Sequence, residues 1–246
     1  MEELHPALRG RRAVIFDVGG TLTHPDWPRL AQLGREVAGG ALTAEEMERA
    51  FKEGLREFDA CVRRGVPAPF DATRRNWTFR RMYAGLGLDA ETCERLSALL
   101  DETHAERHLW CGVDADAGRV LAAVRRAGLR TAVVSNTEDG RLEELLQLVE
   151  LKQHFEFLLD SFVVGVRKPD PAIFELALSK LGVAPAEAVF VGDSYGQDAL
   201  PALAAGLGAV LIDPADAHPE SVCPRVRALG ELVSAEPGAA RETSGV

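Results

Sequence analysis

Residues 13–23, AVIFDVGGTLT, contain the pattern from which the fold can be worked out. The apolar run at residues 13–16 predicts a buried strand, and Asp17 follows it directly. Gly19 and Gly20 come next, and glycines there let the backbone approach a ligand closely and present its N–H groups. Because a single aspartate after a strand is often only a cap, the significance of Asp17 depends on the residues that later segments of the chain supply.

Three further polar segments also end apolar runs. The carboxyl ends of parallel strands meet at one edge of a sheet, so we expect these segments to converge on Asp17. Together they supply a hydroxyl, an ammonium and two carboxylates. In chain order they are Ser135 and Asn136 after residues 129–134, Lys168 within residues 166–171, and Asp193 and Asp198 after residues 188–192.

Each of these residues also has an ordinary structural interpretation. Ser135 could be a helix N-cap, although a hydroxyl beside free helix N–H groups equally suits a phosphoryl oxygen. Lys168 could be a solvated surface residue, yet the chain has only four lysines against 24 arginines, which favours a need for a compact charge here. Asp193 could cap a helix while Asp198 faces solvent, but that explanation is poor for all the residues together.

The three aspartates predict a metal site. Asp17, Asp193 and Asp198 would form a cluster of hard oxygen ligands whose like charges repel, so a cation is expected among them. Oxygen ligands with no histidine or cysteine nearby favour Mg²⁺ over zinc.

The four segments together resemble the motifs of the haloacid dehalogenase superfamily. They read FDVGGTLT, VVSN, RKPDPAIF and VGDSYGQD, in the family's order. The resemblance implies an α/β core with a doubly wound, Rossmann-like parallel sheet and an inserted helical cap. It also implies a phosphatase in which Asp17 attacks phosphorus, forming an aspartyl phosphate that water hydrolyses.

The same resemblance assigns a role to each motif residue. The implied substrate is a small phosphorylated metabolite, and the implied cofactor is Mg²⁺. The assignments are Mg²⁺ binding by Asp17, the Gly19 carbonyl and Asp193, with Asp198 in or near that shell; a hydrogen bond from Ser135 to a phosphoryl oxygen; charge compensation by Lys168; and phosphate contacts from Gly20 and Asn136.

One position departs from the family's phosphatase pattern. A second aspartate usually lies two residues after the nucleophile as general acid and base, and this chain has Gly19 there. Such catalysis is worth about 10²–10⁴-fold in rate. Either His24 or Asp26 supplies the proton, or a cap residue does so on closure, or the leaving group, as in acyl or aryl phosphates, needs little acid.

The departure leaves three alternatives open. Phosphonatases of the family have a small residue at this position and a cap lysine that forms a Schiff base, and Lys52 is the only lysine in the expected cap. Its setting does not match the phosphonatase pattern and favours a solvated helix face. Dehalogenases usually lack the acid equivalent to Asp193. A catalytically weakened, haloacid dehalogenase-like binding protein would usually have lost several motif residues.

Composition excludes several function classes. The net charge of −10 over 246 residues and a sequence pI near 5.2 argue against nonspecific nucleic-acid binding, and any phosphate site must be locally positive. No apolar run approaches the roughly 18–20 residues of a membrane span, and the first residues lack an apolar signal core. Four widely spaced cysteines are expected to be reduced thiols in the cytoplasm. The oligomeric state is not predicted.

The helical periodicity of residues 24–110 predicts the cap domain, flanked by a core of residues 1–23 and 111–246. The cap would close over the site and select the leaving group. A capping box at Thr43 begins its second helix. The expected helices span residues 25–37, 44–64, 71–84 and 90–108.

Two clusters within the cap have both functional and structural interpretations. Arg74, Arg75, Arg80 and Arg81 surround Trp77, and we expect the arginines to stay solvated while Trp77 and Phe79 pack. His104 and His108 have the i, i+4 spacing of paired metal ligands. With no third ligand nearby in the sequence, they predict an exposed helix face.

After residue 113 strands and helices alternate, which predicts right-handed βαβ units. The last residues, 238–246, are expected to be disordered. The predicted helices span residues 113–127, 138–151, 171–181 and 198–205, and the predicted strands span residues 129–135, 157–164, 188–191 and, last, 209–212.

Overall fold

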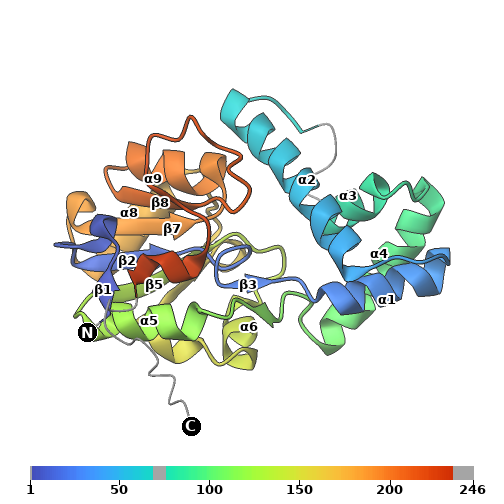
Figure 1. Cartoon of the computed structure of the whole chain (residues 1–246), viewed down its shortest axis with the longest axis horizontal. Helices are drawn as coiled ribbons and strands as arrows, with labels where there is room; N and C mark the ends of the chain where they lie inside the picture. Colours follow the sequence, from blue (N-terminus) through green and yellow to red (C-terminus); the bar gives the residue numbers. More distant parts are fainter. Residues whose placement is uncertain (1, 69–75, 235–246) are drawn as a thin grey trace, which may run out of the picture.

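A computed structural model describes residues 2–68 and 76–234 of the chain. An α/β part that holds the central sheet lies beside a part made of four helices (Figure 1). The predicted disorder of residues 238–246 and the beginning of the helix predicted at residue 71 lie outside the described residues.

The α/β part is built on a six-stranded sheet in which every pairing is parallel. Its strands, in spatial order, are β6 (Leu158–Asp160), β5 (Arg130–Ser135), β2 (Ala13–Phe16), β7 (Ala188–Gly192), β8 (Gly208–Ile212) and β9 (Arg225–Val226). The chain adds strands first on one side of β2 and then on the other, which confirms the doubly wound fold. The carboxyl ends of β5, β2 and β7 therefore meet at the switch point in the middle of the sheet.

Alternate side chains of the central strand face opposite sides of the sheet, as the two-residue period of a strand requires. Val14 and Phe16 belong to one hydrophobic cluster, and Ala13 and Ile15 belong to another. Helices therefore cover both faces. The first cluster includes α5 (Ala117–Arg126) and α6 (Leu142–Leu148), and the second includes α8 (Pro171–Leu181) and α9 (Leu200–Ala204).

The remaining elements of the α/β part are short. The π-helical turn η4 precedes α9 and lies beside the end of β7. The bounds are β1 (Glu3–Leu4) paired antiparallel with β10 (Val233–Ser234), the 3₁₀ turns η1 (Pro6–Leu8), η2 (Lys152–His154), η3 (Pro185–Glu187) and η5 (Leu229–Leu232), α7 (Ser161–Val164), and η4 (Tyr195–Ala199).

Four helices inserted in the chain after β2 pack around a hydrophobic cluster of their own. Thr43 and Glu46 form the predicted capping box: the Thr43 side chain accepts from the Glu46 N–H at 3.2 Å, and the Glu46 carboxylate accepts from the Thr43 N–H at 2.9 Å. We call residues 27–106 the helical insertion. Its helices are α1 (Trp27–Ala38), α2 (Ala44–Arg64), α3 (Trp77–Gly85) and α4 (Ala90–Glu106).

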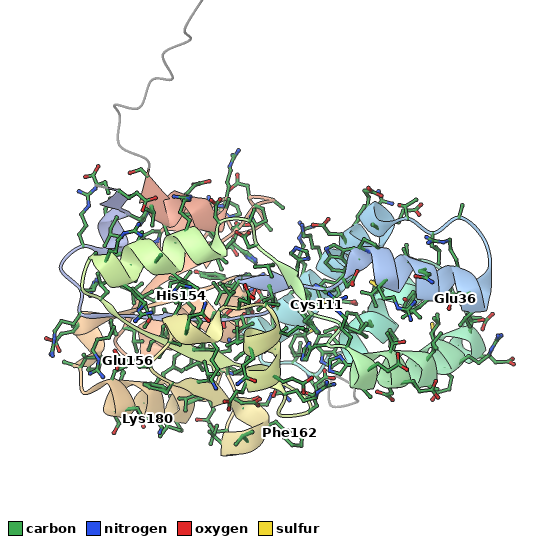
Figure 2. All side chains as sticks on the ribbon, turned by 90° about the horizontal axis from the view of Figure 1, so that it is seen from below. Glu36, Cys111, His154, Glu156, Phe162 and Lys180 are labelled. Carbon is green, nitrogen blue, oxygen red and sulfur yellow. The ribbon has the colours of Figure 1, made fainter. Side chains whose placement is uncertain are left out.

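A two-stranded antiparallel ribbon connects the helical insertion to the α/β part. It consists of β3 (Thr23–His24) and β4 (Gly112–Val113). Figure 2 shows Cys111 at this junction and Glu36 at the far end of the insertion. The ribbon lies close to the predicted domain boundaries at residues 24 and 110, and the division into core and cap stays a prediction.

Several predicted elements of the α/β part have different bounds. The helix predicted from residue 113 begins at Ala117, because Gly112–Val113 forms β4 instead. Of the helix predicted over residues 138–151, only residues 142–148 are helical, as α6. The strand predicted over 157–164 ends at Asp160, whose side chain accepts from the Phe162 N–H at 3.0 Å and so begins α7. Two short strands, β9 and β10, follow the strand predicted to be the last.

The described residues include all the cysteines and the long helices of the chain. All four cysteines lie in the described residues, and none forms a disulfide bond. Among the helices of residues 2–68 and 76–234, none combines the length and the apolar character needed to cross a membrane. The cytoplasmic location stays a prediction.

Candidate active site

The four predicted segments converge at the carboxyl edge of the sheet. Asp17 directly follows β2, Ser135 ends β5, and Asp193 directly follows β7. These residues, with Lys168 and Asp198, line one cavity of about 630 Å³ that also borders the helical insertion. The parallel order of the strands thus brings together groups that lie far apart in the sequence.

Lys168 lies between two aspartates. Its Nζ is 2.6 Å from Asp17 Oδ1 and 2.6 Å from Asp198 Oδ1, and its side chain is only 3% exposed, so it is not a solvated surface lysine. Burial alone would lower the pKa of Lys168, but the two carboxylates raise it above its usual value. The lysine is therefore a charged ammonium at physiological pH.

The three aspartates form a compact acidic cluster. Asp17, Asp193 and Asp198 each offer a carboxylate oxygen, and these atoms lie within 4.8 Å of one another. Burial, together with the charges of the other two aspartates, raises the pKa of Asp193 well above its usual range. Burial also raises the pKa of Asp198 to about 6, with Lys168 opposing and Asp17 adding to the shift.

This donor set fits a magnesium ion. One ammonium faces three carboxylates, so the cluster carries excess negative charge that a divalent cation would offset. The donors are hard oxygens, which Mg²⁺ prefers.

The helix-cap alternatives for Ser135 and Asp193 do not hold. The helix after β5 begins at Leu142 with Arg141 as its N-cap, so Ser135 does not cap it and instead lines the cavity. Ser194, not Asp193, caps η4 by accepting from the Gln197 N–H at 3.0 Å.

Asn136 holds the backbone of Lys168. The Lys168 N–H donates to Asn136 Oδ1 at 2.9 Å, and Asn136 Nδ2 donates to the Lys168 carbonyl at 2.9 Å. The same amide nitrogen donates to Gln197 Oε1 at 3.1 Å. These contacts position the lysine, and a phosphate contact from Asn136 stays a prediction.

Residue 20 must be glycine because the Asp193 side chain lies close to its backbone. Its φ is +85°, and a Cβ atom there would lie 2.1 Å from Asp193 Oδ2. We expected its N–H to be free for a ligand, but this N–H donates to the Thr23 carbonyl at 2.7 Å and closes the loop. Phosphate binding by Gly20 stays a prediction.

Trp110 occupies the space beside Gly19 that the family's second aspartate would need. A Cβ atom at Gly19 would lie 2.9 Å from Trp110 Cζ3 and 3.2 Å from Cε3. Trp110 also lines the cavity. Its role was not predicted from the sequence, because nothing in its neighbourhood shows that it folds back against the first motif.

The alternative proton donors differ in their surroundings. His24 lines the cavity, with its ring stacked on Trp27 and its Nδ1 3.0 Å from the Pro25 carbonyl. Asp26 instead caps α1, accepting from the Arg29 N–H at 3.1 Å.

Lys52 and the predicted arginine cluster have structural surroundings. Lys52 is exposed and pairs with Glu48 at 2.5 Å, and both residues line the cavity. Trp77 and Phe79 are buried, as predicted. The arginines of α3 form ion pairs, Arg80 with Glu94 and Arg81 with Glu57, whereas Arg74 and Arg75 lie outside the described residues.

The prediction of an exposed face for His104 and His108 was wrong. Both are 6% exposed, because the loop after β5 packs against α4, where Asp139 Oδ2 is 2.8 Å from His104 Nε2. The Nδ1 atoms of the two rings accept main-chain N–H groups of Leu109 and Trp110 at 3.2 and 3.3 Å. In the neutral rings Nε2 then carries the proton, so these nitrogens lack the free lone pairs that a metal needs.

Known proteins resemble this chain in sequence and in fold. The haloacid dehalogenase-like hydrolase family matches residues 11–206. Haloacid dehalogenase-like hydrolase domain-containing protein 3 of Mus musculus is 36% identical over 238 residues, covering 90% of each chain. Phosphoglycolate phosphatase 1 of Pseudomonas aeruginosa is 29% identical over 208 residues, covering 82% of this chain and 69% of the relative.

Solved structures share the fold. HAD-hydrolase YfnB of Bacillus subtilis, solved with magnesium bound, has a TM-score of 0.66 at 19% identity and covers 91% of this chain and 97% of its own. L-2-haloacid dehalogenases are also among the matching structures. The fold is therefore shared by enzymes that hydrolyse phosphate esters and enzymes that remove halide.

Proposed function

The chain belongs to the haloacid dehalogenase-like hydrolase family, and from that premise we propose that it is a Mg²⁺-dependent phosphatase of small phosphorylated metabolites. The single observation that carries this proposal is the buried cluster in which Lys168 Nζ lies 2.6 Å from the oxygens of both Asp17 and Asp198. An ammonium held against the nucleophile, with excess acidic ligands beside it, suits an anionic phosphoryl group.

In the proposed reaction Asp17 is the nucleophile. One of its oxygens forms a bond to phosphorus, the bond to the leaving oxygen breaks, and water later hydrolyses the aspartyl phosphate. Lys168 offsets the negative charge that gathers between Asp17 and the phosphoryl oxygens, and Ser135 donates a hydrogen bond to one of those oxygens. Asp198 and Asn136 keep Lys168 in place.

Mg²⁺ would be held by Asp17, the Gly19 carbonyl and Asp193, and when bound it supplies positive charge that reduces repulsion between two anions. The helical insertion acts as the cap in this proposal, because it borders the cavity and would exclude water from it.

The test is phosphate release from a panel of phosphorylated metabolites that includes phosphoglycolate and phosphoserine. Release should require Mg²⁺, should stop with EDTA, and should fall by at least about 10³-fold in Asp17→Asn. Asparagine preserves the shape of the side chain and leaves Lys168 paired with Asp198. Unchanged release by this variant would show that the nucleophile is wrong.

A dehalogenase remains the second candidate, because Gly19 leaves the site without the usual acid of the phosphatases. Halide release from a 2-haloacid in the presence of EDTA would favour it. The acidic cluster favours the phosphatase, since attack on a carbon needs no metal.

A further inference from the structure

The cavity wall provided by the helical insertion and its junction is aromatic. All three tryptophans of the chain line the cavity. The aromatic lining residues are Trp27, Phe51, Phe58, Trp77, Phe79 and Trp110.

These rings form contiguous surfaces. The Phe51 ring lies 5.1 Å from that of Trp27, 6.1 Å from Phe79 and 5.5 Å from Trp110, measured between centroids. The Phe58 and Trp77 rings are 4.7 Å apart. Trp27, Phe51, Trp77 and Phe79 are themselves buried, so an apolar group entering the cavity would mainly meet the half-buried rings of Trp110 and Phe58, which pack against them.

The charges that α2 places on the same wall are mostly neutralised by neighbours. Lys52 and Glu48 pair with each other, and Asp59 accepts hydrogen bonds from the Ser194 hydroxyl at 2.5 Å and the Gly196 N–H at 2.6 Å. The remaining lining charge of α2 is Arg56, which is exposed. A small, highly charged leaving group would find few partners on this wall.

The absence of an acid at Gly19 also favours an aromatic leaving group. Trp110, rather than a carboxylic acid, lies beside this residue, so an alkoxide would have to leave without the usual proton donor. A phenolate leaves readily without protonation, because its charge is delocalised over the ring.

We propose, building on the phosphatase function above, that the substrates are aryl phosphate esters whose ring lies against Trp110. An Asp17 oxygen forms a bond to phosphorus as the bond from phosphorus to the aryl oxygen breaks, and the phenolate departs with that electron pair. Water then attacks phosphorus, the bond to Asp17 breaks, and the protons of water pass to the products, giving a phenol and hydrogen phosphate.

Three esters separate binding of the ring from the need for acid. With Mg²⁺, the wild-type enzyme is assayed with phenyl phosphate, benzyl phosphate and phosphoglycolate. Phenyl and benzyl phosphate should have KM values within about threefold of each other, because both present a ring. The kcat for phenyl phosphate should exceed that for benzyl phosphate by about 10²-fold or more, because benzyl alkoxide needs an acid. Phosphoglycolate should have the lowest kcat/KM.

The outcomes distinguish this inference from the proposed function. No phosphate release from any ester would overturn the phosphatase proposal itself. Release from phosphoglycolate with a kcat/KM equal to or above that for phenyl phosphate would leave the phosphatase standing and overturn the aryl assignment. A KM for benzyl phosphate like that for phosphoglycolate would overturn the role of the aromatic wall.

Matched variants test the wall directly. Trp110→Leu should raise KM for both ring-bearing esters by about tenfold and leave KM for phosphoglycolate unchanged. Phe58→Leu, at another half-buried position of the wall, provides a second variant should Trp110→Leu not fold, as judged by circular dichroism. Arg49→Gln, at an exposed position of α2 that does not line the cavity, is the control and should leave phenyl phosphate kinetics unchanged. Loss of phosphoglycolate turnover in Arg56→Gln would instead identify an anionic leaving group.

Discussion

At the scale of single residues, Gly19 and Trp110 together define the unusual part of the site. The nearest indole atom lies 2.9 Å from the position that a Cβ atom on residue 19 would take. Trp110 also packs against Phe51 and Phe79, with centroid distances of 5.5 and 5.9 Å. The absence of the acid therefore involves two residues, because Trp110 fills the space beside Gly19 that an aspartate would need.

This pairing predicts the effect of restoring the acid. Gly19→Asp alone should give little gain with an alkyl phosphate, because the new Cβ collides with Trp110. The double variant Gly19→Asp/Trp110→Ala should raise kcat for benzyl phosphate by about 10-fold or more, towards the range of general acid catalysis. Steady-state kinetics of both variants, with Trp110→Ala as control, measure this. An equal gain in the single variant would show that the indole is not an obstacle.

Most of the site was predictable residue by residue, because each motif residue directly follows or ends a recognisable strand. Asp17, Ser135 and Asp193 could be placed at one edge from strand order alone. Trp110 could not, and neither could the contact of His104 with Asp139. Both depend on how the helical insertion packs against the α/β part, and local sequence patterns do not encode that packing.

At the scale of elements, the buried carboxylate of Asp59 joins helix α2 to the turn η4 and the residue before it. Asp59 is 5% exposed and accepts from the Ser194 hydroxyl and the Gly196 N–H, with Arg63 Nε at 3.2 Å. Ser194 adjoins Asp193 of the acidic cluster. The contact thus joins the helical insertion to the segment that carries the metal ligands.

Removing this carboxylate should destabilise the protein. Asp59→Ala leaves the Gly196 N–H and the Ser194 hydroxyl without their acceptor, which should lower the unfolding free energy by roughly 1–3 kcal/mol. The Mg²⁺ concentration for half-maximal activity should also rise. Urea denaturation and metal titration measure these effects, with Glu53→Ala on the exposed side of α2 as control. The contact would be unimportant if both variants unfolded at the same urea concentration.

The bounds of a helix were predictable where a capping residue marks its beginning or its end. The helix of residues 171–181 has Asp170 as N-cap and ends at Gly182, which adopts the left-handed conformation with φ of +60°. The helix expected from residue 138 begins only at Leu142. Before it, Glu138 accepts from the Asn76 N–H at 2.7 Å and Asp139 contacts His104, so tertiary contacts hold these residues outside the helix.

At the scale of the whole molecule, a histidine pair lies between the helical insertion and the α/β part. His104 of α4 and His108, just after that helix, face Asp139, Arg141 and Glu144 of the α/β part. Burial, assisted by His104, lowers the pKa of His108 to about 4. Burial tends to raise the pKa of Asp139. The hydrogen bonds from the His104 side chain and the Arg141 N–H outweigh burial and lower this pKa to about 2.

The lowered pKa of His108 predicts that acid reduces the stability of the folded protein. Between pH 6.5 and about 4 the unfolded chain binds a proton at His108 while the folded chain does not, so the unfolding free energy falls as the pH falls. The shift corresponds to roughly 3 kcal/mol for this group. Urea denaturation at pH 7 and pH 5 should show a smaller loss in His108→Gln than in the wild type. Equal losses in both proteins would mean that His108 does not cause the effect.

The proposed function as a whole depends on covalent chemistry at Asp17. The most direct measurement is acid quenching of the enzyme during turnover of a radiolabelled phosphate ester with Mg²⁺, followed by proteolysis and mass spectrometry. We expect a phosphoryl group on the peptide that contains Asp17, and none in Asp17→Asn. Turnover that labels a different residue, or that leaves no label on the protein under conditions where acyl phosphates survive, would contradict the proposal.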